Sequence, residues 1–272
     1  MAKSTSPETV LFITLDSCRY DTFAGAKVPH LRSVGELHRA MAPGYFTFAS
    51  HAAMFAGFTP GIADRPQSFV NPKFGKLFKL AGGGSAAIGT DHLTLTGRTI
   101  VEGFKRKGFL TAGTGAVGWF NPATETGRVL TQDFDTFYYA GNRGSLAKQI
   151  RWITSEMERS DRPVFAFINV GETHVPYYHD GAPWPVESNP CVPFSNNNNA
   201  AECRRRQKAS LEFADSLLAP LLERARAGTT LVCGDHGDCW GEDGLWEHGF
   251  YHPKVLEVPL LFRLPASAAQ PH

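Results

Sequence analysis

The sequence has no apolar run that could cross a membrane. Its first apolar run, residues 10–15, is far shorter than the roughly 20 residues that a membrane helix needs. Residues 1–8 are polar and lack the apolar core of a signal peptide. We therefore expect a cytoplasmic protein without a membrane partner.

The sequence also has no excess of charge of either sign. Charged residues make up 19% of the 272 residues, and the formal net charge is only +1. Because nucleic-acid binding relies on a strongly basic surface, this balance argues against a nucleic-acid partner. The hydrophobic content of 42% is instead typical of a globular chain with a buried core.

Cysteine is scarce and is not arranged in pairs. There are five cysteines, an odd number, and none has the Cys-x-x-Cys spacing of a thiolate metal site or a redox motif. This pattern favours reduced thiols. Only Cys191 and Cys203, which lie in one loop region, suggest a disulfide as an alternative.

The glycine run 82–84 is not followed by the Lys-Ser/Thr of a P-loop, so we expect a flexible turn there.

Apolar, β-rich runs alternate with segments of helical spacing along the chain. We predict strands at residues 10–15, 109–113, 133–139, 164–170, 229–233 and 258–262. We predict helices at residues 30–41, 50–55, 99–107, 146–158 and 200–225, with Ser50 as the cap of the second. This alternation predicts an α/β fold with a mainly parallel central sheet flanked by helices on both faces. We expect a single domain over residues 1–272, with irregular insertions around residues 57–97 and 177–199.

Three of the predicted strands end in polar clusters. Asp16 follows the first strand, and Glu172 and His174 follow the strand at 164–170. Asp235 and His236 follow the strand at 229–233. Because ligand sites lie outside the carboxyl ends of parallel strands, these clusters can converge on a divalent metal ion, whose usual ligands are carboxylates and imidazoles. Taken alone, a strand-end aspartate is more often a helix cap or turn residue, and a lone histidine is more often a packed one; it is the three clusters together that indicate a metal site.

Three segments resemble, in the same order, segments of the alkaline phosphatase/sulfatase superfamily. Residues 12–21, Phe-Ile-Thr-Leu-Asp-Ser-Cys-Arg-Tyr-Asp, are similar to the opening of sulfatase-like hydrolases, where a strand delivers a metal-binding acid. Residues 45–60, which include Thr-Phe-Ala-Ser-His, resemble the nucleophile segment. Residues 234–262, which begin Gly-Asp-His-Gly-Asp, are similar to the second metal segment. The chain therefore resembles the short bacterial sulfatase-like metalloenzymes, with a minimal alkaline phosphatase-like fold.

The resemblance implies a role for each matched residue. The implied metal ligands are Asp16, Thr47, Asp235 and His236. Thr47 is also the implied nucleophile, because metal coordination lowers the pKa of a threonine hydroxyl and orients it. The implied catalytic histidines, which protonate the leaving group or contact the substrate oxygens, are His174 and His248. The implied substrate-binding residues are Arg19, Ser50, His51 and His252.

Departures from the sulfatase pattern narrow the predicted reaction. Sulfatases carry Cys-x-Pro-Ser-Arg where this chain has Thr-Phe-Ala-Ser-His at residues 47–51, so a formylglycine sulfatase is not expected. A threonine resembles the phosphodiesterase, phosphonate-ester hydrolase and phosphotransferase branches. We predict a metal-dependent hydrolase or transferase of phosphate esters, of the phosphodiester or phosphonate type, that acts through a covalent phospho-threonine.

The cofactor and the substrate are defined only by class. We expect one divalent ion (Zn, Mn, Mg or Ca), because the Asp-x-x-x-His pair that holds the other metal of two-zinc relatives is not found. A second ion stays open, because Glu172 with His174, His179 and His252 are imperfect substitutes for that pair. The expected partner is a small anionic ester or a modified peptide. The alternatives are an accessory biosynthetic enzyme acting on a modified peptide or small metabolite, a sulfate ester hydrolase, and a metal-binding module without catalysis.

Overall fold

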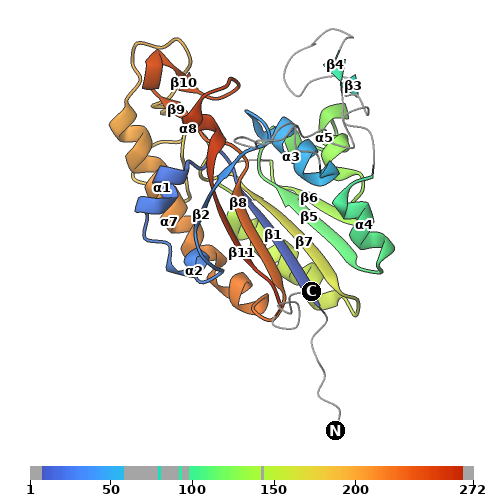
Figure 1. Ribbon diagram of the computed structural model, residues 1–272. Helices are drawn as coiled ribbons and strands as arrows, with labels where there is room; N and C mark the ends of the chain where they lie inside the picture. Colours follow the sequence, from blue (N-terminus) through green and yellow to red (C-terminus); the bar gives the residue numbers. More distant parts are fainter. Residues whose placement is uncertain (1–7, 58–78, 81–91, 94–97, 142–143, 266–272) are drawn as a thin grey trace, which may run out of the picture.

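A seven-stranded sheet forms the centre of the protein. The computed structural model describes residues 8–57, 79–80, 92–93, 98–141 and 144–265. The strand order is β2-β11-β8-β1-β7-β5-β6. These strands are β1 (Thr9–Leu15), β2 (His38–Met41), β5 (Leu110–Gly115), β6 (Thr136–Tyr139), β7 (Val164–Val170), β8 (Thr229–Gly234) and β11 (Glu257–Arg263). Every neighbouring pair is parallel except the two that contain β11, which confirms the predicted α/β fold with a mainly parallel sheet (Figure 1).

Helices cover both faces of this sheet. One face carries α1 (Tyr20–Gly25), α2 (Pro29–Arg32), α6 (Leu146–Arg159) and α7 (Ala200–Arg224). The other face carries α3 (Thr47–Ala56), α4 (Ile100–Arg106) and α5 (Glu125–Thr131). The remaining short elements are α8 (Pro253–Leu256), the 3-10 turns η1 (Gly118–Phe120) and η2 (Glu242–Gly244), and the small ladders of β3 (Lys79–Leu80) with β4 (His92–Leu93) and of β9 (Cys239–Trp240) with β10 (Trp246–Glu247).

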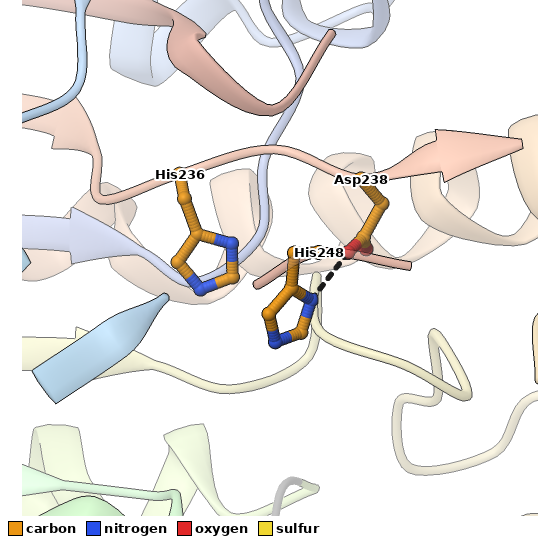
Figure 2. A group of neighbouring side chains, drawn as sticks. All are labelled: His236, Asp238 and His248. Atoms are coloured by element: carbon orange, nitrogen blue, oxygen red, sulfur yellow. Dashed lines mark hydrogen bonds and ion pairs between the residues drawn. The ribbon is translucent and has the colours of Figure 1, made fainter. Parts of the chain in front are cut away.

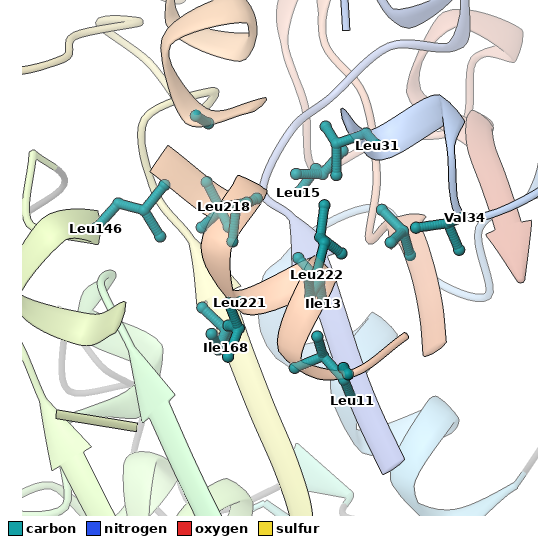
Figure 3. Packing of buried hydrophobic residues seen from close by; sticks show 14 of the residues in the cluster. Leu11, Ile13, Leu15, Leu31, Val34, Leu146, Ile168, Leu218, Leu221 and Leu222 are labelled. Atoms are coloured by element: carbon teal, nitrogen blue, oxygen red, sulfur yellow. The ribbon is translucent and has the colours of Figure 1, made fainter. Parts of the chain in front are cut away.

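The central strands are buried from both sides. Alternate side chains of a strand point to opposite faces of the sheet. Leu11, Ile13 and Leu15 of β1 therefore join the aliphatic core against α7 (Figure 3), whereas Phe12 joins an aromatic core on the opposite face. All of β7 is buried as well. Because a strand covered on both faces has no solvent side, it reads as a continuous apolar run, and this is why the sequence pattern identified β1, β7 and β8.

The predicted helix at residues 30–41 is wrong beyond its first turn. α2 is only four residues long, and residues 38–41 form β2, which pairs antiparallel with β11. Gly35 lies between them at a point where a Cβ would come within 2.4 Å of the carbonyl oxygen of Phe262. Only glycine allows this approach of the two backbones. Pairing with β11 therefore overrides the helical spacing of the apolar residues, which is a local preference.

Most of the other predicted elements are confirmed, with shifts at their ends. α6 and α7 match the predicted helices closely, and β6, which lies at the edge of the sheet, falls within the strand predicted at residues 133–139. The helix that contains Ser50 begins earlier than predicted, at Thr47, so Phe46 and not Ser50 is its N-cap residue. Residues 177–199 contain no helix or strand, as expected for the predicted loop. The insertion predicted around residues 57–97 lies mostly outside the described residues.

Two further features concern the cysteines and the helices. All five cysteines are buried and are free thiols in the structure, and the reduced state stays a prediction. Within the described part of the chain, none of the helices has both the length and the apolar character that crossing a bilayer requires.

Candidate metal centre and active site

The carboxyl ends of β1 and β8 bring two aspartates together. Leu15 pairs with Gly234 in the parallel register, so Asp16 and Asp235 leave the sheet at the same point. A glycine is needed at residue 234 because a Cβ there would come within 2.9 Å of the carbonyl oxygen of Cys18. Residues that are more than 200 positions apart in the sequence therefore share one end of the sheet.

Asp16 is fully buried, and its two carboxylate oxygens have different surroundings. Asn169 Nδ2 donates a hydrogen bond to Oδ2 at 3.1 Å, and this bond fixes the side chain. Oδ1 instead lies 3.5 Å from Thr47 Oγ1 and 3.7 Å from His236 Nε2. One oxygen of Asp16 is thus held by the protein, while the other faces the residues that are predicted to share a metal ion.

Asp235 is fixed in a similar way. Its Oδ1 accepts hydrogen bonds from the backbone N–H groups of Ser17 at 3.0 Å and His236 at 2.9 Å. Ser17 adopts a left-handed backbone (φ 57°), a conformation that is uncommon outside glycine and typical of functional sites. Oδ2 of Asp235 is buried and has no hydrogen-bond partner among the described residues. Burial raises the pKa of Asp235, and the neighbouring Asp16 carboxylate raises it further.

His236 presents an unprotonated nitrogen to both carboxylates. Its Nδ1 lies 3.0 Å from the carbonyl oxygen of Gly237, and because a carbonyl can only accept, Nδ1 carries the proton. Burial lowers the pKa of His236 to about 3, so the ring is neutral and Nε2 has a free lone pair. A neutral imidazole oriented in this way is the form that binds metal ions.

The residues present fit a divalent cation. His236 Nε2 lies 3.7 Å from Asp16 Oδ1, 3.4 Å from Thr47 Oγ1 and 3.6 Å from Asp235 Oδ2. A tetrahedral ion with bonds of about 2.0–2.2 Å separates its ligand atoms by roughly 3.3–3.6 Å. Two buried carboxylates side by side, one with an unpartnered oxygen, are costly unless a positive charge lies between them. The donor set and its spacing therefore match the metal ligands that the sequence predicted.

Thr47 is positioned by the first turn of α3. A Cβ at Gly44 would come within 2.8 Å of the backbone nitrogen of Ser50, so only glycine lets the preceding segment fold closely over the helix start. The backbone N–H of Gly249 donates to the carbonyl oxygen of Tyr45 at 2.9 Å and ties this segment to the neighbourhood of His248. The unpaired N–H groups at a helix start favour an anion, so Thr47 lies where a phosphate group would be stabilised.

His51 supports α3 from within. Its Nδ1 lies 2.7 Å from the carbonyl oxygen of Thr47 and therefore donates, and its Nε2 lies 2.9 Å from Thr14 Oγ1 and accepts. The side chain is fully buried, and burial lowers the pKa of His51 to about 4. Because both ring nitrogens have protein partners, the geometry offers no support for the predicted contact between His51 and a substrate.

His248 and Asp238 form a hydrogen-bonded pair next to His236 (Figure 2). His248 Nδ1 lies 2.6 Å from Asp238 Oδ1, and the centroids of the His248 and His236 rings are 4.2 Å apart. Burial alone lowers the pKa of His248, but the charge and the hydrogen bond of Asp238 outweigh it and raise that pKa. Burial alone raises the pKa of Asp238, and His248 holds it below its usual value.

His174 reaches the same cluster from the loop after β7. Its Nδ1 donates to the carbonyl oxygen of Val175 at 2.9 Å, and its Nε2 lies 3.9 Å from Asp16 Oδ1. The ring centroids of His174 and His248 are 5.3 Å apart. Both histidines predicted to be catalytic therefore lie beside the predicted metal ligands.

Three other predicted substrate-binding residues have different surroundings. Arg19 is buried and pairs with Asp21 at 2.6 Å and Glu242 at 2.8 Å, which uses its guanidinium inside the protein. His252 caps α8, where its Nδ1 accepts from the backbone N–H of Lys254 at 3.0 Å. Ser50 is buried within α3, and its hydroxyl has no hydrogen-bond partner among the described residues. Of the three, only the Ser50 hydroxyl is left without a protein partner.

The Glu172 carboxylate does not belong to the grouping of Asp16, Asp235 and His236 that has metal-ligand spacing. Its Oε1 accepts from the backbone N–H of Leu146 at 2.8 Å and so caps the start of α6. Burial raises the pKa of Glu172 to about 8. His179, another weak candidate for a second metal, stacks on Phe213 at a centroid distance of 4.4 Å. A second grouping with metal-ligand spacing is formed instead by His236, Asp238 and His248, whose ligand atoms lie within 4.8 Å of one another.

Two residues of the site had no role assigned from the sequence. Asn169 was read as part of an apolar strand, although a lone amide in a buried run is itself a signal that it has a polar partner. Asp238 was recognised only as part of the Gly-Asp-His-Gly-Asp motif. Its pairing with His248 could not be read from the sequence because the two residues are ten positions apart, and only the fold of β9, η2 and β10 between them brings them together.

Comparison with known proteins gives similarity of structure but not of sequence. No protein family model and no curated protein matches the chain. The soluble domain of lipooligosaccharide phosphoethanolamine transferase A from Neisseria meningitidis superposes with a TM-score of 0.64 at 11% identity, over 98% of this chain and 79% of that one. The C-terminal periplasmic domain of EcEptC from Escherichia coli in complex with Zn gives a TM-score of 0.63 at 13% identity, over 97% and 74% of the two chains.

A third structure names the superfamily directly. An alkaline phosphatase superfamily protein from Vibrio parahaemolyticus gives a TM-score of 0.57 at 13% identity and is matched by 96% of this chain. The chain covers 61% of the length of that protein. At identities this low, the superposition shows the fold alone, and the reaction has to be argued from the site. The protein has the fold of the alkaline phosphatase superfamily, as its sequence motifs predicted.

Proposed function

We propose that this protein is a metal-dependent phosphate-ester hydrolase or phosphotransferase in which Thr47 is the nucleophile. The observation that carries the proposal is the position of the Thr47 hydroxyl, 3.5 Å from Asp16 Oδ1 and 3.4 Å from His236 Nε2 at the start of α3. A hydroxyl buried among metal-binding groups at a helix N-terminus has the surroundings of an activated nucleophile that attacks an anion.

The cation would be held by Asp16, Asp235 and His236, with Thr47 as a further ligand. When bound, it would lower the pKa of the Thr47 hydroxyl and offset negative charge on the substrate. Thr47 Oγ1 loses its proton to solvent water and attacks phosphorus, the new O–P bond forms a phospho-threonine, and the bond to the leaving alcohol breaks. Attack by water completes a hydrolase cycle, whereas attack by a second alcohol completes a transferase cycle.

The leaving oxygen needs a proton, and His248 has the better geometry to donate it. Asp238 holds the Nδ1–H of His248, which leaves Nε2 as the nitrogen for the substrate. The Asp238 charge raises the pKa of His248 and so favours the protonated ring that an acid catalyst requires. His174 lies on the same side, 3.9 Å from Asp16 Oδ1, where it can contact a substrate oxygen.

Phosphate esters are the favoured substrate class for two reasons. Thr47 replaces the cysteine or serine from which sulfatases make formylglycine. In addition, one of the proteins with this fold is named as a phosphoethanolamine transferase. A sulfate ester is therefore the comparison substrate in the test and not the expected one.

The test compares wild type with T47A and T47S, each loaded separately with Zn²⁺ or Mn²⁺. The substrates are a 4-nitrophenyl phosphate monoester, phosphodiester, phosphonate ester and sulfate ester. Each is tested with and without glycerol, an acceptor alcohol that distinguishes transfer from hydrolysis. We expect T47A to lose roughly a thousandfold or more in kcat, as nucleophile removal does elsewhere, and T47S to retain part of the activity. Mass spectrometry after an acid quench should find one phosphoryl group on the Thr47 peptide. Undiminished turnover by T47A would refute the nucleophile.

A further inference from the structure

We propose that Tyr177 is a positioning residue that fixes the orientation of His248 through Asp238. The inference rests on the proposed function only in giving His248 a substrate to protonate. It concerns a chain of buried side chains, Trp240, Tyr177, Asp238 and His248, which runs from the loop after β7 and the β9 ladder to the cluster of site histidines.

Each link of this chain is a short hydrogen bond with a defined direction. Trp240 Nε1 can only donate, and it lies 2.8 Å from the Tyr177 hydroxyl. The hydroxyl therefore directs its own proton to Asp238 Oδ2, at 2.8 Å. Asp238 Oδ1 is left to accept from His248 Nδ1 at 2.6 Å.

Burial makes this hydrogen-bonded series of side chains rigid. Tyr177 and Asp238 are fully buried, and Trp240 is 3% exposed. Tyr177 also has a left-handed backbone (φ 57°), which is rarely adopted by a bulky residue unless its surroundings enforce it. A carboxylate that is hydrogen-bonded at both oxygens cannot rotate freely, so the plane of Asp238 sets the plane of the His248 ring.

The orientation matters because of where the ring points. With Nδ1 directed at Asp238, the other edge of His248 is turned away from the carboxylate (Figure 2). The centroid of the His248 ring lies 4.2 Å from that of His236 and 5.3 Å from that of His174. Removing the Tyr177 hydroxyl would leave Asp238 Oδ2 buried without a donor and free to compete with Oδ1 for His248. The orientation of Nε2 would then spread over several directions.

The first arm of the test measures leaving-group dependence. Wild type and Y177F are compared on aryl phosphodiesters whose leaving groups range from 4-nitrophenyl to phenyl. Y138F is the matched control, because Tyr138 stacks on Trp152 of α6 and takes no part in the hydrogen-bonded series of Trp240, Tyr177, Asp238 and His248. We expect Y177F to lower kcat roughly tenfold or more for phenyl and much less for 4-nitrophenyl, with KM and bound metal unchanged. In an H248Q background, Y177F should cause no further loss, because the residue that it positions is absent.

The second arm does not depend on turnover. Nuclear magnetic resonance of the full chain with isotope-labelled histidine reports the hydrogen-bonded Nδ1–H of His248, which is assigned by its absence in H248Q. We expect Y177F to shift or broaden this signal and Y138F to leave it unchanged.

The two arms separate the possible failures. An unchanged His248 signal in Y177F, or an equal loss of kcat for all leaving groups, would overturn the positioning role. A shifted signal in a protein that turns over no ester would overturn the proposed function and uphold the role of Tyr177.

Discussion

Replacing Asp235 by asparagine should stabilise the metal-free protein and abolish its response to metal. An asparagine keeps the carbonyl-type Oδ1 that accepts from the backbone N–H groups of Ser17 and His236. Its amide nitrogen takes the place of Oδ2, which has no hydrogen-bond partner among the described residues. The substitution therefore removes one of two adjacent buried charges without removing a hydrogen bond.

The magnitude follows from the separation of the two carboxylates. Ligand atoms of Asp16 and Asp235 lie within 4.8 Å of each other, and both residues are fully buried. Two unit charges at that distance repel by about 3.5 kcal/mol at an effective dielectric constant of about 20. For a chain of this size, that corresponds to a rise in Tm of roughly 5–10 °C. Metal at a hundred times its Kd stabilises wild type by about 2.7 kcal/mol, and D235N should not gain this.

The stability difference between metal-free D235N and wild type should depend on pH, and the sign of that dependence follows from the pKa of Asp235. Burial and Asp16 raise the pKa of Asp235 in the folded protein above its value in the unfolded chain. When the pKa of a carboxyl is higher in the folded protein than in the unfolded chain, the free energy of unfolding falls as pH rises through the folded-state pKa. The advantage of metal-free D235N over wild type should therefore be large at neutral pH. It should vanish below about pH 4, where the carboxyl is protonated in both states.

Thermal unfolding of wild type and D235N in chelator, and then with Zn²⁺ or Mn²⁺, measures both effects. D238N is the matched control, because its carboxylate already has two protein donors in Tyr177 and His248 and should cost stability when it is neutralised. A metal-free D235N that melts below wild type, or that gains as much as wild type from metal, would refute the reasoning about the paired carboxylates.

Three further predictions concern groups around the centre. N169A removes the donor to Asp16 Oδ2, so metal affinity by titration should fall roughly 10- to 100-fold, and equal affinity would contradict the role of Asn169. Burial lowers the pKa of His51 to about 4, so protonation of this residue in the unfolded chain should lower the free energy of unfolding by about 3 kcal/mol as pH falls from 6.5 to 4. Urea unfolding of H51Q should show a smaller loss of stability over this pH range, and an equal loss would contradict the buried neutral state of His51. G35A places a Cβ 2.4 Å from the Phe262 carbonyl oxygen and should lower the free energy of unfolding by about 2 kcal/mol or more, whereas an unchanged midpoint would contradict the close approach of β11.

The residues of the site could be predicted from the sequence in kind, but their directions could not. The order of the motifs indicated Asp16, Thr47, Asp235 and His236, and the fold brings these four together. The sequence could not show that Glu172 caps α6, because Leu146, whose backbone N–H donates to it, lies 26 positions away in the chain. For the same reason, the sequence could not show that Asp238 pairs with His248.

Local patterns by themselves determined the centre of this protein. A strand covered on both faces must be apolar along its whole length, so β1, β7 and β8 were visible as continuous runs, and polar residues had to follow where those runs ended. Tertiary structure alone decided the edge strand β2 and the orientation of side chains. β2 is a strand because β11 supplies its hydrogen bonds, and which oxygen of Asp16 faces the centre depends on Asn169, a neighbour that only the packed sheet brings near.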